Sequence, residues 1–476
     1  MNFEIRYSRF DIRNSWLLSM YKIILATRYL VKRHITYFAV LAVALCVFIV
    51  VVVMTVLTGL VRDFKQKNHQ FTGDCVVGTE SLVGFAYYED FIKMLEKTDF
   101  IESSSAVIKS YALVSPSWTE QGLGLEIMGI DPVKHCKTTA FGQTLHYRKN
   151  DVTKAFEPVF DQNLPGCVLG IEVGYRLGNA LAPQRSPMGG YFYSDRLEET
   201  AISVSCVPLT AKGAPAQADL GLINTQNFYC SDYSHSGLAR VDTSFIYLPI
   251  NYAQLLCGMA GPVKRANAIH IKFQPNVKLQ TGCKKVASLW MNFKQKHAGE
   301  EQAYLLETVT VQSWKDYRRA YIAAMEKEQT MMTAMFILVG ITTVFIIFVV
   351  FYMIISHKSK DIGILKSIGI SNWNIVQLFM GFAFLVGVLG SAVGACSGWL
   401  FLRKMNQIEN WLFEHFEFQL WDRTIYAIGD IPNQVEFDCL AVIILSAILA
   451  CLVGALLPSW QTIRLKPVET LQVSRL

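Results

Sequence analysis

The sequence has few charged residues, and in four long stretches it has none. Only 17% of its 476 residues are Asp, Glu, Lys or Arg, against about a quarter in ordinary soluble domains. The stretches without charge are 35–61, 329–356, 367–402 and 439–463. Each is long enough for the ~20 helical residues that cross a bilayer core of ~30 Å, and the first is too long for the apolar core of a signal peptide. The sequence therefore predicts four membrane-spanning helices.

Several signatures of catalysis are also absent. The apolar spans contain no ionisable residue, which argues against a secondary transporter because such proteins couple through one. The chain lacks a GxxxxGK[ST] phosphate loop, an HExxH motif and a GxSxG motif. Its Cys and His spacings do not indicate zinc. We therefore expect no catalytic, cofactor-binding or metal-binding residues, and we expect that the chain is not itself an enzyme.

The cysteines show no disulfide framework. Between the first two spans there is an odd number of them, at irregular spacing: Cys75, Cys136, Cys167, Cys206, Cys230, Cys257 and Cys283. An oxidising compartment would permit disulfides. The pattern favours buried thiols for most of these residues and leaves any pairing open.

Charges around the spans predict the orientation. The leader 1–34 has seven basic and two acidic residues, and the loop 357–374 has three lysines and one aspartate. The loop 403–438 reverses the bias, with three basic and seven acidic residues. Because basic loops face the cytoplasm, we expect the leader, the loop 357–374 and the tail 464–476 to be cytoplasmic, and 62–328 to lie outside.

The region 62–328 is long enough to bury its own core. Short apolar runs bounded by turn residues predict strands at 75–78, 106–115, 123–130, 167–171, 201–207, 244–250 and 268–273. Helical periodicity predicts helices at 87–98, 250–261 and 283–297. The Pro- and Gly-rich stretch 182–200 predicts a loop. We expect an α/β part and a mostly β part.

The approach to the second span lacks helix breakers. From Val311 there is no Gly or Pro until Gly340, which predicts one continuous helix that leaves the outer domain as a stalk and enters the membrane. The alternative is a pair of helices with a break near Gln329.

The expected fold class is an α+β membrane protein, in which four transmembrane helices carry a large mixed α/β extracytoplasmic domain inserted between helices 1 and 2. The expected parts are a leader with an interfacial elbow helix (1–34), the first span (35–61), the outer domain with its stalk (62–328), the second span (329–356), a cytoplasmic segment (357–374), the third span (375–402), an outer loop (403–438), the fourth span (439–463) and a tail (464–476). For the elbow, a helix lying on the membrane surface and a simple basic anchor remain open.

The charged interruption "SHKSKDIGILKSIGIS" at 356–371 has an apolar stripe. Ile362, Leu365 and Ile368–Gly369 are expected on one face of a short helix, with the lysines exposed. One interpretation is a solvated turn with snorkelling lysines. The other is a helix that docks into a groove of a partner through anchors at i and i+3.

Glycines recur every four residues in the third span, at Gly390, Gly394 and Gly398. Small residues at this period let two helices approach closely. We favour packing within the chain, against the second or fourth span, over a seam between two copies.

Several segments resemble a known family. "KSKDIGILKSIGIS" resembles the coupling segment of FtsX-like permeases of ABC transporters, "LATRYLVKRH" their elbow, and "LLPSWQTIRLKPVETLQV" their C-terminal end, here with Arg464, Pro467, Glu469 and Leu471. "IMGIDPVKH", "LPGCVLGIEVGYRLG", "DTSFIYLPINYAQLL" and "IYAIGDIPNQVEF" are similar to segments of the lipoprotein-releasing (LolC/LolE) permeases. The first ~20 residues, the cysteine-rich outer region and the segment 181–240 lie outside the resemblance.

The resemblance implies a mechanotransmitting transporter subunit in the bacterial inner membrane, with both termini cytoplasmic. ATP and Mg would be bound by a separate ABC ATPase subunit, and a second permease, identical or homologous, would complete a dimer. A lipoprotein would enter between the first and second spans and leave toward a periplasmic carrier. The coupling residues implied are Ser359, Lys360, Asp361, Ile362, Gly363, Ile364, Leu365, Lys366, Ile368 and Gly369. The residues suggested to line a substrate cavity are Val52, Leu57, Met335 and Phe345.

Other functions stay open on the sequence. Efflux, or control of a cell-wall hydrolase, would use the same mechanical stroke within the same family. A membrane receptor or scaffold without an ATPase is the alternative from a different class, and it predicts a dispensable coupling segment.

Overall fold

A computed structural model describes residues 34–464 except for 118–121, 160–163, 180–181, 187–189, 195–196, 198–199, 217–222, 358 and 417–430. The described residues form two compact units. The sheet unit is Arg62–Met325, and the helical unit consists of the described parts of Met1–Val61, Glu326–Glu417 and Ile431–Leu476. The predictions for the leader, for the tail beyond residue 464 and for the first six residues (425–430) of "IYAIGDIPNQVEF" lie outside the described residues.

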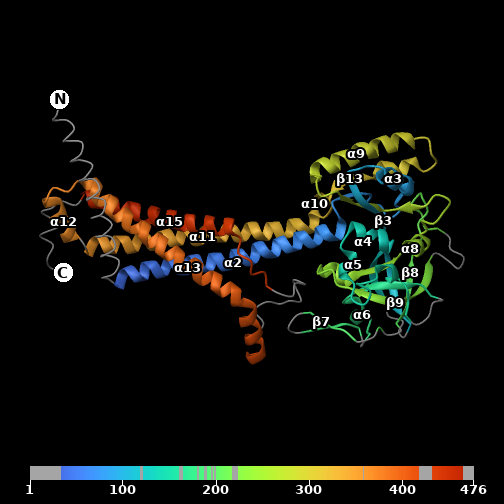
Figure 1. The fold of residues 1–476 in the computed structure, drawn as a ribbon, viewed down its shortest axis with the longest axis horizontal. Helices are drawn as coiled ribbons and strands as arrows, with labels where there is room; N and C mark the ends of the chain where they lie inside the picture. The colour runs from blue at the N-terminus through green and yellow to red at the C-terminus, as the bar shows by residue number, and fades with distance from the viewer. Residues whose placement is uncertain are drawn as a thin grey trace. The chain divides into compact units, whose positions relative to one another are not determined.

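Four long apolar helices are present, as predicted. They are α2 (His34–Thr72), α11 (Arg319–His357), α13 (Asn372–Phe416) and α15 (Phe437–Arg464) (Figure 1). Each is long and apolar enough to cross a membrane. The short helix α12 (Ser359–Ser367) follows α11.

Two of these helices continue by more than ten residues past the C-terminal ends of the charge-free stretches. α2 ends at Thr72, where Gly73 adopts a positive φ of 77° and its N–H donates to His69 O over 2.8 Å, a glycine stop that a larger residue would strain. α13 ends at Phe416, so the first part of the segment predicted as the outer loop 403–438 is helical. Charged residues do not end a helix, and 403–416 contains neither Gly nor Pro.

A nine-stranded sheet forms the core of the sheet unit, in the order β13-β1-β12-β3-β4-β10-β5-β9-β8. β8 also pairs with β3, so six of these strands, from β3 through β4, β10, β5 and β9 to β8, close into a ring. The strands of the sheet are β1 (Cys75–Gly78), β3 (Ile101–Pro116), β4 (Leu123–Ile130), β5 (Gly166–Gly170), β8 (Ala201–Cys206), β9 (Asn224–Ser234), β10 (Phe245–Pro249), β12 (Ala268–Phe273) and β13 (Thr310–Ser313). Two small sheets pair β2 (Phe85–Ala86) with β11 (Arg265–Ala266) and β6 (Gln184–Arg185) with β7 (Tyr191–Phe192).

Helices cover this sheet and complete a mixed α/β fold. They are α3 (Tyr88–Leu95), α4 (Pro132–Thr138), α5 (Phe141–Thr144), α6 (Val173–Arg176), α7 (Ala239–Ser244), α8 (Ile250–Leu256), α9 (Leu279–Lys296) and α10 (Trp314–Tyr317), with 3-10 turns at Val152–Lys154 and Ala303–Thr308. Phe91 of α3 and Trp290 of α9 pack edge to face at 4.8 Å, a favourable aromatic geometry. All seven predicted strands and all three predicted helices of this region are present.

The start of the stalk differs from the prediction. Val311 lies in strand β13, opposite Val77 of β1, and α10 then makes a single turn before α11 begins at Arg319. The prediction of one helix from Val311 was therefore wrong, because pairing with a distant strand outweighs the local helical preference. The alternative break near Gln329 was also wrong, since α11 is continuous there.

Candidate functional site

Among the side chains of α12 that the structure describes, that of Ile362 is buried. Ile362 is only 2% exposed and packs with Ile355 of α11 and with Ile375 and Phe379 of α13. Burying such a side chain stabilises the contact by about 1.5–3 kcal/mol. α12 is therefore packed against the ends of both helices that flank it.

Other apolar side chains of this segment face outward. Ile364 is 48% exposed, Ile368 is 73% exposed, and Trp373 at the start of α13 is 65% exposed. The predicted single face with Ile362, Leu365 and Ile368–Gly369 was therefore wrong: α12 ends at Ser367, so Ile368 is past its last turn and outside its i, i+3 series. The side chains of Ser359, Lys360, Asp361 and Leu365 lie outside the described part of the structure.

Gly369 shapes the turn from α12 into α13. Its φ is +94°, a conformation that glycine adopts without strain and other residues avoid. Its N–H donates to Lys366 O at 3.0 Å and closes the end of α12. The turn thereby leaves Ile368 exposed beside the partly buried Ile370.

The glycines of α13 bring this helix against α2. A Cβ atom placed on Gly390 would lie 2.7 Å from Val43 Cβ, and one on Gly394 would lie 2.8 Å from Val47 Cβ. One on Gly398 would lie 3.1 Å from Val51 Cγ1. The glycines thus pack within the chain, but the predicted partner was wrong, because they face the first span and not the second or fourth.

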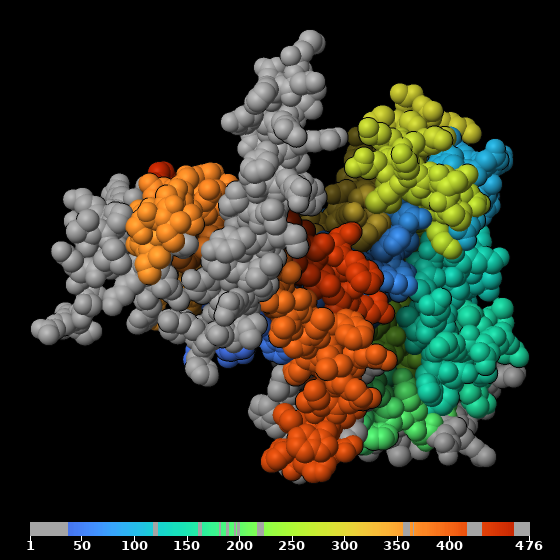
Figure 2. Space-filling model, turned by 60° about the vertical axis from the view of Figure 1, so that its left-hand side comes forward, coloured from blue at the N-terminus to red at the C-terminus, as the bar shows by residue number. Residues whose placement is uncertain are grey.

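Other faces of α13 meet the remaining long helices. Gly387 faces α15, where an added Cβ would lie 3.2 Å from Cys451 Cβ, and Phe382 packs against Phe351 of α11 with ring centres 5.6 Å apart. α13 and α15 lie side by side in Figures 1 and 2. Gly spacing marks a face for close approach, but only the bundle decides which helix occupies it.

α11 carries an exposed apolar surface. Met335 is 60% exposed and Phe345 is 65% exposed, whereas Val52 and Leu57 of α2 are half-buried. α2 and α11 are in contact, since Thr343 Oγ1 lies 2.8 Å from Cys46 Sγ. The suggested cavity residues thus belong to two helices that are in contact. The side chains on α11 are more exposed than those on α2.

In the sheet unit, the ends of α2 and α11 are joined through neighbouring strands. β1 follows α2 and pairs antiparallel with β13, which precedes α10 and α11. Across this junction the Arg318 Nε–H donates to Asn68 Oδ1 at 2.8 Å, and Asn68 is fully buried. The C-terminal end of α2 and the start of α11 are therefore held together by both backbone and side chains.

A second set of contacts reinforces the junction. His69 Nε2 lies 2.7 Å from Asp74 Oδ1, and its ring stacks on Trp314 of α10 at 4.8 Å. The other carboxylate oxygen of Asp74 accepts the Phe273 N–H at 2.7 Å. Burial opposes ionisation of Asp74, but these hydrogen bonds and the nearby His69 hold its pKa below the usual value.

Three basic groups lie beneath the junction, and no local sequence pattern predicts them. His135 and His270 are buried with ring centres 5.7 Å apart, and the Lys109 ammonium lies 4.5 Å from the centre of the Tyr317 ring. Burial, with the charge of Lys109 added, lowers the pKa of His135 to about 3. Burial chiefly lowers the pKa of Lys109 to about 7. Both histidines are therefore neutral at pH 7.

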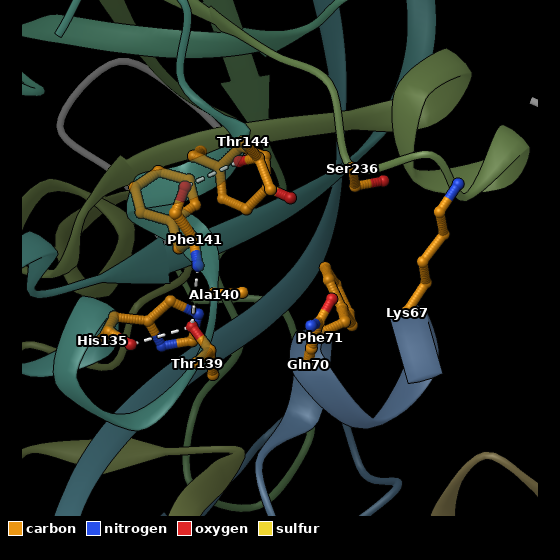
Figure 3. Close-up of a pocket in the computed structure, with 10 residues that line it drawn as sticks. Lys67, Gln70, Phe71, His135, Thr139, Ala140, Phe141, Thr144 and Ser236 are labelled. Carbon is orange, nitrogen blue, oxygen red and sulfur yellow. Dashed lines mark hydrogen bonds between the residues drawn. The ribbon is translucent and has the colours of Figure 1, made fainter. Parts of the chain in front are cut away.

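A small cavity opens beside the C-terminal end of α2 (Figure 3). Its volume is about 30 Å³, which suits ordered water and not a substrate. Lys67 lines it and donates to Gly237 O at 3.4 Å, and burial lowers the pKa of this lysine. Among the described residues no group of three His, Cys, Asp or Glu could hold a metal ion.

Comparisons with known proteins find similarity over part of this chain. Residues 333–467 match the family model described as "FtsX-like permease C-terminal". The "Lipoprotein-releasing system transmembrane protein LolC" of Xylella fastidiosa strain 9a5c is 25% identical over 162 residues, which are 34% of this chain and 39% of that protein. LolC of Neisseria meningitidis serogroup B is 28% identical over 170 residues, 35% of this chain and 40% of that protein. The matches thus span about two fifths of the length of these relatives.

Solved structures similar to the chain include the periplasmic region of MacB from Actinobacillus actinomycetemcomitans, which is 12% identical, with a TM-score of 0.29, over 53% of this chain and 94% of that structure. The extracellular domain of the YknZ transporter from Gram-positive bacteria is 11% identical, with a TM-score of 0.28, over 51% of this chain and 99% of that structure. The family match and the four apolar helices indicate a bacterial membrane protein.

Proposed function

We propose, from the FtsX-like permease C-terminal domain at residues 333–467, that this chain is the permease subunit of a mechanotransmitting ABC transporter that extracts lipoproteins from the inner membrane. ATP with Mg is hydrolysed by a separate ATPase subunit on the cytoplasmic side. A second permease, identical or homologous, completes the transporter, and a periplasmic carrier receives the lipoprotein. Both termini of the chain are then cytoplasmic.

The observation that carries the proposal is the two-sided character of α12. Ile362 fixes the helix to α11 and α13 from within, while Ile364, Ile368 and Trp373 are open to a partner. Apolar anchors on a short helix suit a groove on another protein. A push on Ile364 reaches α11 and α13 through Ile362, whereas a push on Trp373 acts on α13 directly.

α11 supplies the route outward. It is one helix from Arg319 to His357, and its outer end is tied to β13, β1 and α2 by the contacts of Arg318 and Trp314. A continuous helix transmits displacement along its axis better than a jointed one. The stroke that begins at α12 therefore ends at the strands that carry the outer end of α2.

The substrate is assigned from the apolar surface and from the relatives. Met335 and Phe345 are exposed on α11, and acyl chains need apolar walls without an ion path. The relatives named LolC belong to lipoprotein-releasing systems. These two facts support a lipoprotein over a small polar substrate.

A photo-crosslinking experiment tests the substrate. A photoreactive amino acid replaces Phe345 on α11 or, as a matched control, Leu445 on α15, which are 65% and 70% exposed. After irradiation of cells, the proposal predicts an acylated protein bound to the chain labelled at position 345, with a much smaller yield at 445.

Three results would count against the proposal. Capture of small hydrophobic molecules alone would indicate efflux. Equal capture of acylated protein at both positions would indicate general exposure to the membrane. Purification of the chain from its native membranes without an ATPase subunit would indicate a receptor or scaffold.

A further inference from the structure

Cysteines that are distant in the sequence meet inside the sheet unit. Cys206 and Cys257 lie with their sulfurs 3.9 Å apart, the thiols of Cys75 and Cys283 share a hydrogen bond, and Cys167 lies opposite Cys230 on neighbouring parallel strands. The spacing of the cysteines in the sequence does not predict these pairs, because the two members of each pair belong to different elements. The residues of the first pair are separated by 51 positions.

The contact between Cys206 and Cys257 is fixed by its surroundings. Cys206 ends β8, and its register partner on β9 is Asn224. The Asn224 side-chain amide donates to Leu255 O at 3.0 Å, in the last turn of α8. The Leu209 N–H donates to Cys257 O at 3.1 Å. The ends of β8 and α8 are therefore tied together on both sides of the sulfur pair.

A disulfide would bring the two sulfurs to a distance of ~2.05 Å. Cys206 is the last residue of β8 and Cys257 directly follows the last residue of α8, so both lie at the end of an element, where a small backbone shift disturbs the fewest hydrogen bonds. Gly258, directly after Cys257, adopts a φ of 73°. In the folded contact the hydrogen bond from Cys257 lowers the pKa of Cys206 to about 7, so the two thiols interact directly.

We propose that Cys206 and Cys257 form a disulfide in the mature protein. The inference rests on the proposed extracytoplasmic position of the sheet unit, where disulfides persist. The oxidant is a protein disulfide of that compartment. The Cys206 thiolate attacks it and releases one thiolate, the Cys257 thiolate then attacks the mixed disulfide and releases the second, and the two protons that leave the cysteines join the reduced oxidant. The bond forms during folding, before both sulfurs are buried.

The test uses the full-length chain in its own membranes. Free thiols are blocked with N-ethylmaleimide, the protein is unfolded in the same reagent, and it is digested with trypsin without reductant. Trypsin releases Cys206 in residues 197–212 and Cys257 in residues 241–264, each with a single cysteine. The modified peptide with Cys136 confirms that blocking was complete, and the Cys257→Ala variant is the matched control.

The expected result is one linked species containing both peptides in most molecules of the wild type. In the Cys257→Ala variant this species is absent and Cys206 carries maleimide. Recovery of both wild-type peptides with maleimide on each cysteine would overturn the inference, as would linkage of Cys206 to another cysteine.

A topology measurement separates this inference from the proposed function. Met291 on α9 is 66% exposed, and an impermeant maleimide should label the Met291→Cys variant in intact spheroplasts. Labelled Met291→Cys with free Cys206 and Cys257 would reject the disulfide alone. Unlabelled Met291→Cys in intact spheroplasts would reject the extracytoplasmic position, and both proposals with it.

Discussion

At the residue scale, absent side chains decide how closely the helices approach. Gly390, Gly394 and Gly398 face Val43, Val47 and Val51, which repeat every four residues along α2 and are buried. Each valine occupies the space that a larger residue on α13 would need. Gly387 of α13 faces α15, whereas Gly381 of the same helix has no neighbouring atom within 4 Å of an added Cβ.

Replacing Gly394 with Leu should therefore separate α13 from α2. Overpacking of this kind costs about 1–3 kcal/mol, so we expect a lower thermal midpoint of the detergent-purified protein and a lower amount in the membrane. The same replacement at Gly381 is the control and should leave both values near those of the wild type. Equal losses for the two variants would show that the close α2–α13 contact is not what Gly394 provides.

Neutral His135 makes the stability of the sheet unit depend on pH. Its pKa is about 3 in the folded chain and ~6.5 when unfolded, so the unfolded chain binds more protons between these values. The free energy of unfolding should fall as pH decreases from ~6.5 toward 3, by about 1.4 kcal/mol per pH unit from this residue. Denaturant unfolding at pH 6.5, 5.5 and 4.5 measures it. The His135→Gln variant should lose less stability on acidification than the wild type, and parallel pH curves would contradict the assignment.

At the element scale, most strands of the sheet unit were predictable because their sequences are apolar. Polar strands that pair with distant segments were not predictable. β1, β5 and β10 are continuous apolar runs with buried side chains, and such runs are visible in a single sequence. β9 is polar, yet the buried Asp232 within it accepts backbone N–H groups from His146, Tyr147, Arg148 and Tyr233. A polar strand whose partners lie far along the chain gives no local signal.

The candidate site was predictable to a similar extent. The sequence located α12 and the small-residue face of α13, because charge and glycine spacing are local properties. It did not reveal which side of α12 is buried, which depends on Ile355 and Phe379 from two other helices. It also could not show the junction of Asn68 with Arg318, which are 250 positions apart.

The junction is expected to hold the start of α11. Replacing Arg318 with Ala removes its bond to the buried Asn68, and a hydrogen bond to a charged group contributes about 1.5–3 kcal/mol. We expect hydrogen exchange of the α10 and first α11 amides to accelerate about 10- to 100-fold. The neighbouring Arg319 is exposed, and Arg319→Ala is the control. Unchanged exchange in Arg318→Ala would show that backbone pairing of β13 suffices.

At the scale of the whole molecule, α11 connects α12 with the sheet as one continuous helix. Ile362 links α12 to α11 and α13, α11 continues unbroken to Arg319, and β13 joins β1 in the nine-stranded sheet. We propose that force enters this series of contacts at the exposed side chains of α12 and the adjoining turn, and that a separate ATPase subunit supplies it.

The most direct test is the ATPase activity of the complex purified from native membranes, with Ile364 and Ile368 both replaced by Glu. The matched control is Met291→Glu on α9, a similarly exposed apolar position in the sheet unit. We expect Ile364→Glu with Ile368→Glu to remove most of the ATPase activity recovered with the chain, at unchanged membrane abundance, while Met291→Glu retains it. Full ATPase activity in the double variant would show that force does not enter through these side chains.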